Sequence, residues 1–172
     1  MSFLTAGLLS VQSLRIWDRP VQQPKLFSIH NAFVKFLRIA YAWLIVSCVL
    51  FVIAVPSDHS GGIWGASRHA ITVGFVAGMV FVIAPRIDPA LCGMRILWSA
   101  RLMFWSLLLL HAGCALRVIA EPLAYENASV IAWTWLPVSV VLELAAVSLF
   151  AVNLGVTLLR PPAHLRNQVS TP

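Results

Sequence analysis

Charged residues are scarce in this chain, and their scarcity excludes most water-soluble folds. Of the 172 residues, 10% are charged and 60% are hydrophobic, whereas an average soluble domain is about 25% charged. So few polar side chains cannot cover the surface of a soluble globule. The sequence therefore predicts a protein that folds in a lipid bilayer, and its length allows one small membrane domain.

Cysteine is also rare, and the three cysteines present do not indicate a disulfide framework. Cys48 and Cys114 lie inside long apolar runs, Cys92 lies between two such runs, and no two of them form a CxxC pair. We therefore expect reduced thiols. The chain also contains no phosphate-binding glycine loop, no nucleophile elbow and no HExxH zinc motif, so these enzyme classes are not indicated.

Long apolar runs are what the sequence does contain. Each should form an α-helix, because backbone polar groups in lipid must find partners within their own segment. We predict an all-α membrane protein with a four-helix transmembrane bundle over residues 33–160, between an N-terminal cytoplasmic or interfacial segment, 1–32, and a cytoplasmic tail, 161–172. Four runs reach the roughly 20 residues that cross a bilayer, at about 33–55, 63–84, 97–119 and 131–159.

Basic residues gather on one side of this predicted bundle. Ten of the twelve Lys and Arg residues precede or begin the first run, surround the second loop, or follow the fourth run. Because Lys and Arg are enriched in cytoplasmic loops, we predict that both termini and the middle loop are cytoplasmic. This topology accounts for the basic composition, and we expect no nucleic-acid partner.

Two histidines lie inside the predicted spans, where ionisable side chains are informative because they are costly. His69 lies about 9 Å after the start of the second span, and His111 about 12 Å before the end of the third, at 1.5 Å per residue. Adjacent antiparallel helices would place them at similar depth. Two imidazoles so arranged are typical of a b-type haem or a copper site, although either one alone could merely hydrogen-bond to a neighbouring helix.

Three other ionisable residues accompany the histidines. Arg68 and Arg117 flank them, where they could pair with haem propionates or extend toward the outer headgroups. Glu143 lies near the middle of the fourth run, where a free carboxylate would be costly. It could relay protons or orient a ligand histidine through its second nitrogen. The role we expect is packing against Arg101 or a serine.

Gly74 and Gly78 form a GxxxG pattern in the second run, with Ala70 and Ala77 nearby on that side of the helix. Small residues at this spacing let two helices approach closely in lipid. The pattern predicts a tight helix contact that requires no chemistry.

Three stretches carry a resemblance to a known family. They contain Tyr41-Ala42-Trp43 in the first run, His69 to Gly74 at the start of the second, and Leu116-Arg117-Val118 at the end of the third. Together they resemble the C-terminal part of the NnrS family, bacterial haem- and copper-containing membrane proteins linked to nitric oxide metabolism. Ile71 stands where the family has leucine, and Arg38 stands where a histidine is typical.

The resemblance implies a function for the chain. It implies binding of haem b or copper in nitric oxide tolerance or respiratory electron transfer, with His69 as the ligand that matches the family motif. The depth argument adds His111 as a second ligand. An alternative is a cofactor-free membrane subunit or assembly partner of a larger respiratory complex, and a small transporter is a weaker third. The expected partners are the lipid bilayer and other membrane subunits or further copies of the chain.

Overall fold

The computed structural model describes residues 2–14, 33–92 and 97–160, and the regular secondary structure in this part of the chain is helical throughout. The second span is built from three consecutive helical segments, and the other spans are single helices. In chain order the elements are α1 (Ser2–Ser13), α2 (Phe33–Ser57), α3 (Gly62–His69), η1 (Ala70–Ala77), α4 (Gly78–Leu91), α5 (Ala100–Tyr125) and α6 (Ala132–Leu159).

The predicted all-α fold is confirmed, and four apolar helical rods are long enough to cross a bilayer. Three of these rods are α2, α5 and α6, and the fourth is the continuous run Gly62–Asp88. The rods hold 25 to 28 residues each, and a spanning helix needs roughly 20. The chain is therefore a multi-pass membrane protein.

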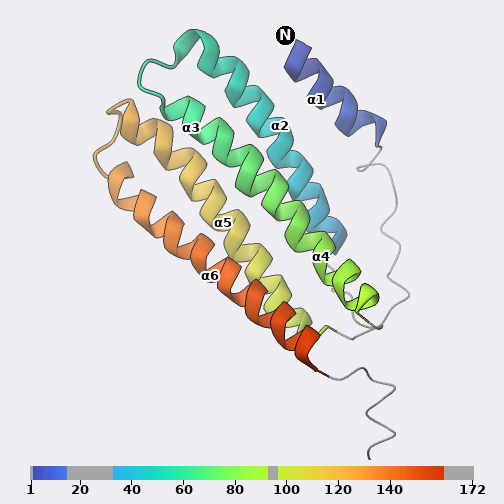
Figure 1. Cartoon of the computed structure of the whole chain (residues 1–172). Coiled ribbons are helices and arrows are strands. Elements are labelled where there is room, and N and C mark those ends of the chain that lie inside the picture. Colours follow the sequence, from blue (N-terminus) through green and yellow to red (C-terminus); the bar gives the residue numbers. More distant parts are fainter. Residues whose placement is uncertain (1, 15–32, 93–96, 161–172) are drawn as a thin grey trace, which may run out of the picture.

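The four rods form one antiparallel bundle in which α5 is the most enclosed (Figure 1). α5 packs most extensively against α6 and also contacts α3, η1 and α4, while α2 packs against α3, η1 and α4. The connections 58–61 and 126–131 lie together at one end, where Ser60 Oγ donates a hydrogen bond to Glu126 Oε1 at 2.6 Å. We call this the loop end. The opposite end, where α2 begins and α6 ends, is the terminal end.

Ser99 sets the start of the third rod later than the sequence predicts. The Ser99 hydroxyl oxygen accepts a hydrogen bond from the Leu102 backbone N–H at 3.2 Å and caps α5. The Asn153 side chain holds this corner by bonding both the N–H and the carbonyl oxygen of Ser99. α5 then continues to Tyr125, six residues beyond its predicted end.

The second rod also runs past its predicted end near Ala84. α4 continues through Pro85 to Leu91. A proline inside a helix removes one backbone hydrogen bond, and membrane helices tolerate this loss where the freed carbonyl finds another partner. Pro85 therefore does not end this helix.

The middle of the second rod is a π-helix, which no feature of the sequence predicted. η1 covers Ala70–Ala77, and π-helical hydrogen bonds join residues five apart instead of four. Such segments are uncommon and frequently lie at functional sites. This one begins directly after His69 and ends directly before Gly78.

Aromatic side chains fill the core of the terminal half, and small side chains fill the loop half. The terminal half contains Phe81 and Phe150, whose rings stack with centroids 4.1 Å apart. Toward the loop end, Ala66, Ala70 and Cys114 are fully buried between the second rod and α5. Small residues at such a contact bring the two backbones close together.

Both glycines of the GxxxG pattern make close contacts with side chains of neighbouring helices. An ideal Cβ at Gly74 would lie 2.5 Å from Cγ of Trp43, and one at Gly78 would lie 3.0 Å from Cε1 of His111. A side chain larger than hydrogen would overpack both positions. The two glycines therefore accommodate large side chains from α2 and α5.

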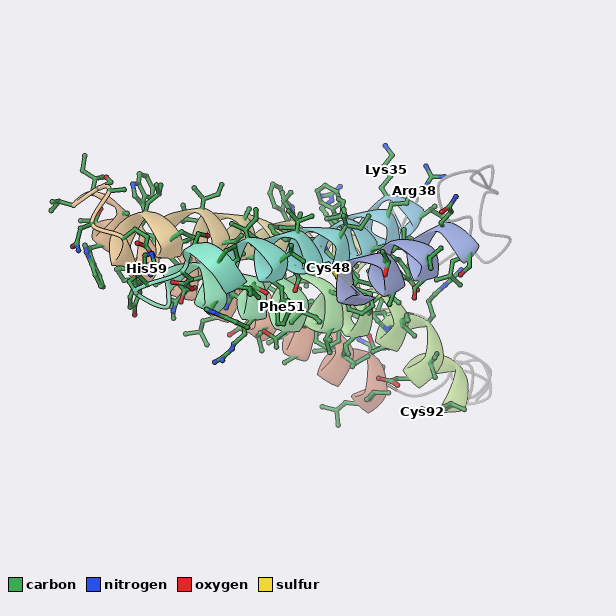
Figure 2. The ribbon with its side chains drawn as sticks, turned by 90° about the horizontal axis from the view of Figure 1, so that it is seen from above. Lys35, Arg38, Cys48, Phe51, His59 and Cys92 are labelled. Carbon is green, nitrogen blue, oxygen red and sulfur yellow. The ribbon has the colours of Figure 1, made fainter. Side chains whose placement is uncertain are left out.

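α1 packs beside α2 within the depth of the bundle (Figures 1 and 2). An ideal Cβ at Gly7 would lie 2.7 Å from Sγ of Cys48, which is near the middle of α2, and Val11 is buried. The 12 residues of α1 extend about 18 Å at 1.5 Å per residue. α1 is therefore too short to cross a bilayer core of about 30 Å.

Basic residues gather at the terminal end. Figure 2 shows Lys35 and Arg38 there, together with Cys92, and shows His59 at the opposite end. Arg86 and Arg160 also lie near this end, in the last part of α4 and just after α6. The side of the membrane that each end faces remains a prediction of the positive-inside rule.

Candidate functional site

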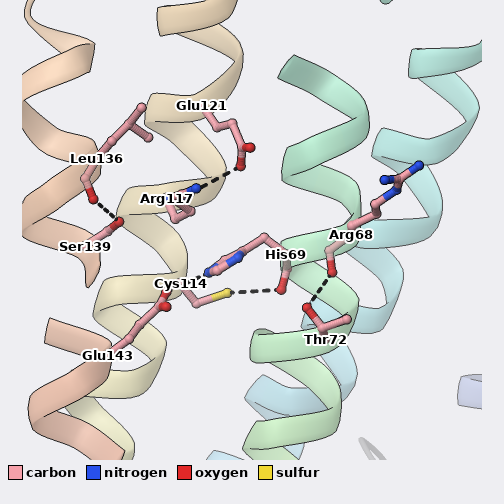
Figure 3. Close-up of polar contacts among 9 residues, drawn as sticks. All are labelled: Arg68, His69, Thr72, Cys114, Arg117, Glu121, Leu136, Ser139 and Glu143. Carbon is pink, nitrogen blue, oxygen red and sulfur yellow. Dashed lines mark hydrogen bonds and ion pairs between the residues drawn. The ribbon is translucent and has the colours of Figure 1, made fainter. Parts of the chain in front are cut away.

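A hydrogen bond between His69 and Glu143 links the second rod to α6 inside the bundle (Figure 3). His69 Nε2 lies 2.7 Å from Glu143 Oε1, and the two side chains are 21% and 18% exposed. A carboxylate within a span needs such a partner, because an unpaired charge in lipid is costly. We expected Arg101 or a serine in this role, and that expectation was wrong, since the partner is the histidine.

Gly113 of α5 lets Glu143 reach this position. An ideal Cβ at Gly113 would lie 2.8 Å from Cγ of Glu143 and 3.1 Å from the carbonyl oxygen of Ser139. α6 therefore packs directly on the backbone of α5 at this level. The glutamate side chain extends past the glycine toward α3, where His69 is the last residue before the π-helix.

Polar side chains continue from this pair toward the loop end. The Cys114 thiol donates a hydrogen bond to the His69 carbonyl oxygen at 3.9 Å. One turn further along α5, Arg117 Nε lies 3.5 Å from Glu121 Oε2 (Figure 3). We call His69, Cys114, Arg117, Glu121 and Glu143 the polar seam.

A second glycine makes room at the loop end of the polar seam. An ideal Cβ at Gly65 would lie 2.7 Å from Cδ of Glu121, so the carboxylate lies directly against the backbone of α3. Glu121 is consequently shielded, with 13% of its side chain exposed. The polar seam therefore has a close helix contact at each end, with α6 at Gly113 and with α3 at Gly65.

His111 lies outside the polar seam, in the aromatic half of the core. Its ring stacks on Phe36 of α2 with centroids 5.8 Å apart and touches Gly78 of α4. The residue is 8% exposed, and neither ring nitrogen has a hydrogen-bond partner among the described residues. This is unusual, because nearly all buried polar side-chain atoms in proteins are hydrogen-bonded.

The structure does not bring the two histidines together. His69 bonds to α6, whereas His111 packs against α2 and α4. They also differ in depth, since His69 lies beside Cys114, three residues or about 4.5 Å beyond His111 along α5. Counting residues from the span ends predicts an approximate depth and leaves the rotation of each helix undetermined.

The two arginines lie in different surroundings. Arg117 belongs to the polar seam, through its contact with Glu121. Arg68 is exposed, and its guanidinium carbon lies 5.9 Å from the centroid of the Trp64 ring. Arg68 therefore lies on the outside of the bundle, as a side chain that extends toward the headgroups would.

Sequence reasoning missed Cys114 and Glu121 as members of the site. The spacing could have indicated them, because Cys114, Arg117 and Glu121 recur at intervals of three and four residues. Residues at these intervals share one face of a helix. The role of Gly113 had no such signal, because it depends on which helix packs against α5.

Residues 29–157 match a family model described as a domain of unknown function, DUF8744. The match covers more than half of the chain. The chain belongs to the DUF8744 family. Searches of curated proteins and of solved structures found no match.

The DUF8744 region contains the whole candidate site. It begins before α2 and ends two residues before the end of α6, so it includes the polar seam and His111. α1 lies outside it. The family description carries no function, and the resemblance to NnrS proteins stays a prediction.

Proposed function

We propose that this DUF8744 protein is an NnrS-like protein of the bacterial inner membrane that binds haem b or copper through His69. Its role would lie in nitric oxide tolerance or respiratory electron transfer. The observation that carries the proposal is the 2.7 Å contact of His69 Nε2 with Glu143 Oε1. A histidine that ligates a metal almost always donates its other ring N–H to a carboxylate, a carbonyl or water.

His69 has the donor atom that such a group requires. With Nε2 held by Glu143, Nδ1 is the remaining ring nitrogen, and it makes no hydrogen bond within the described residues. Neutral imidazole suits both copper and haem iron. When bound, either group supplies one-electron chemistry and a coordination position for nitric oxide. Glu143 fixes the orientation of the ring, and the apolar spans limit access of water.

A group held jointly by His69 and His111 of one chain does not fit this structure. The two rings contact different helices, and no group of three or more His, Cys, Asp and Glu side chains in the described ranges could hold a metal ion. Further ligands would therefore come from a partner subunit or from a second copy of the chain. The partner that we propose is therefore one that supplies the remaining ligands at His69.

Absorbance and metal analysis of the purified full-length protein tests the proposal. We expect a Soret band or a defined copper content in the wild type, and its loss in His69→Ala. His59→Ala is the matched control, because His59 is an exposed histidine of the loop end. Glu143→Gln should weaken binding of the group about 10–100-fold, as changes in such carboxylate partners do.

A colourless and metal-free wild-type preparation would overturn this proposal. It would leave the alternative of a cofactor-free subunit or assembly partner of a larger respiratory complex. That alternative predicts a membrane partner that co-purifies in fixed proportion, in wild type and His69→Ala alike. If the protein has no bound cofactor and no co-purifying partner, but carries a solute into liposomes, it is a transporter.

A further inference from the structure

An apolar cavity lies near the terminal end, between α2, α4 and α5. Its volume is about 40 Å³. Arg86 is the only charged residue among the described lining residues, and its guanidinium carbon lies 3.9 Å from the centroid of the Phe33 ring. The walls are otherwise apolar and largely aromatic, and they include Phe36, Phe81, Val82, Phe104 and Leu107.

His111 lies one helical turn deeper in the bundle than this cavity. Gly78 touches both His111 and Ala40, so these three residues mark one level of the bundle. Each lies four residues, about 6 Å along its helix, from a residue that lines the cavity. The three lining residues are Leu107 for His111, Val82 for Gly78 and Phe36 for Ala40.

Phe36 links the cavity to the histidine. It lines the cavity, and its ring also stacks on the His111 ring at an interplanar angle of 12°. The proposal below requires the Phe36 side chain to rotate, so that a ligand in the cavity can reach the His111 ring. Side-chain rotations of this kind are common when a ligand binds.

We propose that this cavity binds the ring of a lipid-soluble quinone, and that His111 is its hydrogen-bonding residue. A neutral imidazole carries one N–H donor and one bare nitrogen acceptor. The N–H would donate to a quinone carbonyl oxygen, and the bare nitrogen would accept from a hydroquinone hydroxyl. The aromatic walls suit a flat ring, and an isoprenoid tail would extend into the surrounding lipid.

The chemistry of His111 favours this ligand over a lipid chain. An acyl chain would contact the same apolar walls and leave both nitrogens buried without a partner, which is unfavourable. A quinone satisfies one nitrogen and is itself supplied from the bilayer. The cavity is smaller than a quinone ring while Phe36 is in place, so binding requires Phe36 to turn aside.

Calorimetric titration of the purified full-length protein with decylubiquinone and a short-chain menaquinone tests the proposal. The quinone proposal does not depend on whether His69 binds haem or copper. His111→Leu removes both nitrogens at similar volume and should weaken quinone binding at least tenfold. Leu107→Trp should abolish binding by filling the cavity. Leu108→Trp, at a neighbouring position that is 39% exposed, should keep the wild-type affinity.

Four results would overturn the proposal. The first is wild-type protein that binds neither quinone. The second is unchanged affinity in His111→Leu, and the third is displacement of the quinone by decanoate at equal concentration, because both indicate an acyl-chain crevice. The fourth is equal binding by Leu107→Trp and Leu108→Trp. This last comparison decides the matter if His111→Leu fails to give a monodisperse protein.

Discussion

Glycine determines where ionisable side chains can lie inside this bundle. At three glycines, the missing side chain lets an ionisable group lie against the backbone of a neighbouring helix. The three pairs are Glu121 against Gly65, His111 against Gly78 and Glu143 against Gly113. Two of these glycines lie outside the GxxxG pattern, so close helix packing and placement of charge are linked at several levels of the bundle.

Gly113→Ala should destabilise the bundle. The new methyl group would lie 2.8 Å from Glu143 Cγ and 3.1 Å from the Ser139 carbonyl oxygen, and overpacking of this kind costs about 1–3 kcal/mol. The measurement is the free energy of unfolding in detergent. Gly155→Ala is the matched control, because no atom of the described residues lies within 4 Å of its added Cβ. Equal stability of the two variants would contradict the packing described at Gly113.

His69 and Glu143 should be energetically coupled. A double-mutant cycle with His69→Leu and Glu143→Leu should give a coupling energy of about 0.6 kcal/mol or more, since hydrogen bonds between membrane helices average about 0.6 and reach about 1.7 kcal/mol. Each single change leaves the other group unpaired, so the double change should cost less than the sum. His69→Leu combined with Glu126→Leu serves as the additive control, since Glu126 bonds Ser60 instead.

Among the elements, α3 is capped by a residue outside its own bounds. Backbone N–H groups at its start find a partner in Asp58, which precedes the helix by four residues. Asp58 Oδ1 accepts from the Gly61 N–H at 2.7 Å, and Oδ2 accepts from the Trp64 N–H at 2.6 Å. A carboxylate at a helix N-terminus satisfies donors that have no partner within the helix. The loop therefore fixes the start of the rod that carries His69.

The stabilisation of the start of α3 by Asp58 should depend on pH. Loss of hydration alone would raise the pKa of Asp58, but the backbone N–H groups of Trp64, Gly61, Ser60 and Ile63 outweigh it and hold the pKa below its ordinary value of 3.8. Since the folded pKa is the lower one, the stabilisation is present above pH 3.8 and is lost as the pH falls through the folded value.

The measurement is the midpoint of thermal unfolding in detergent below about pH 5. Asp58→Asn keeps a capping oxygen and removes the titration, so its midpoint should fall less on acidification than that of the wild type. Ser57→Ala, next to Asp58 and without charge, should follow the wild type. If the unfolding midpoints of Asp58→Asn and wild type fall equally on acidification, the Asp58 carboxylate does not stabilise the start of α3.

For the whole molecule, the distribution of charge predicts how the bundle is inserted. With the terminal end cytoplasmic, Cys92 should resist a membrane-impermeant maleimide in intact cells and react after the membrane is opened. A His59→Cys, Cys92→Ser variant should react in intact cells. Cys48 and Cys114 are buried and serve as an internal background. The reverse pattern of labelling would contradict the predicted orientation.

Composition and run length were sufficient to predict the fold, because the bilayer restricts a chain this apolar to helices. The site was predicted less well. His69 and Glu143 were each singled out by the cost of an ionisable group in lipid, but their contact depends on how the second rod and α6 are rotated. His111 was paired with His69 on depth alone, and the structure places its ring against Phe36 and Gly78.

The π-helix has a consequence for how positions along the second rod are compared. An α-helix advances about 100° per residue, so a helical wheel places His69 and Gly78, nine residues apart, on opposite sides. η1 lies between them and turns by a smaller angle at each residue, so each half of the rod has its own angular register. Positions for cross-links to α5 must therefore be chosen separately for the residues before 70 and for those after 77. Removing one residue there would rotate the half that carries His69 against the half that touches His111.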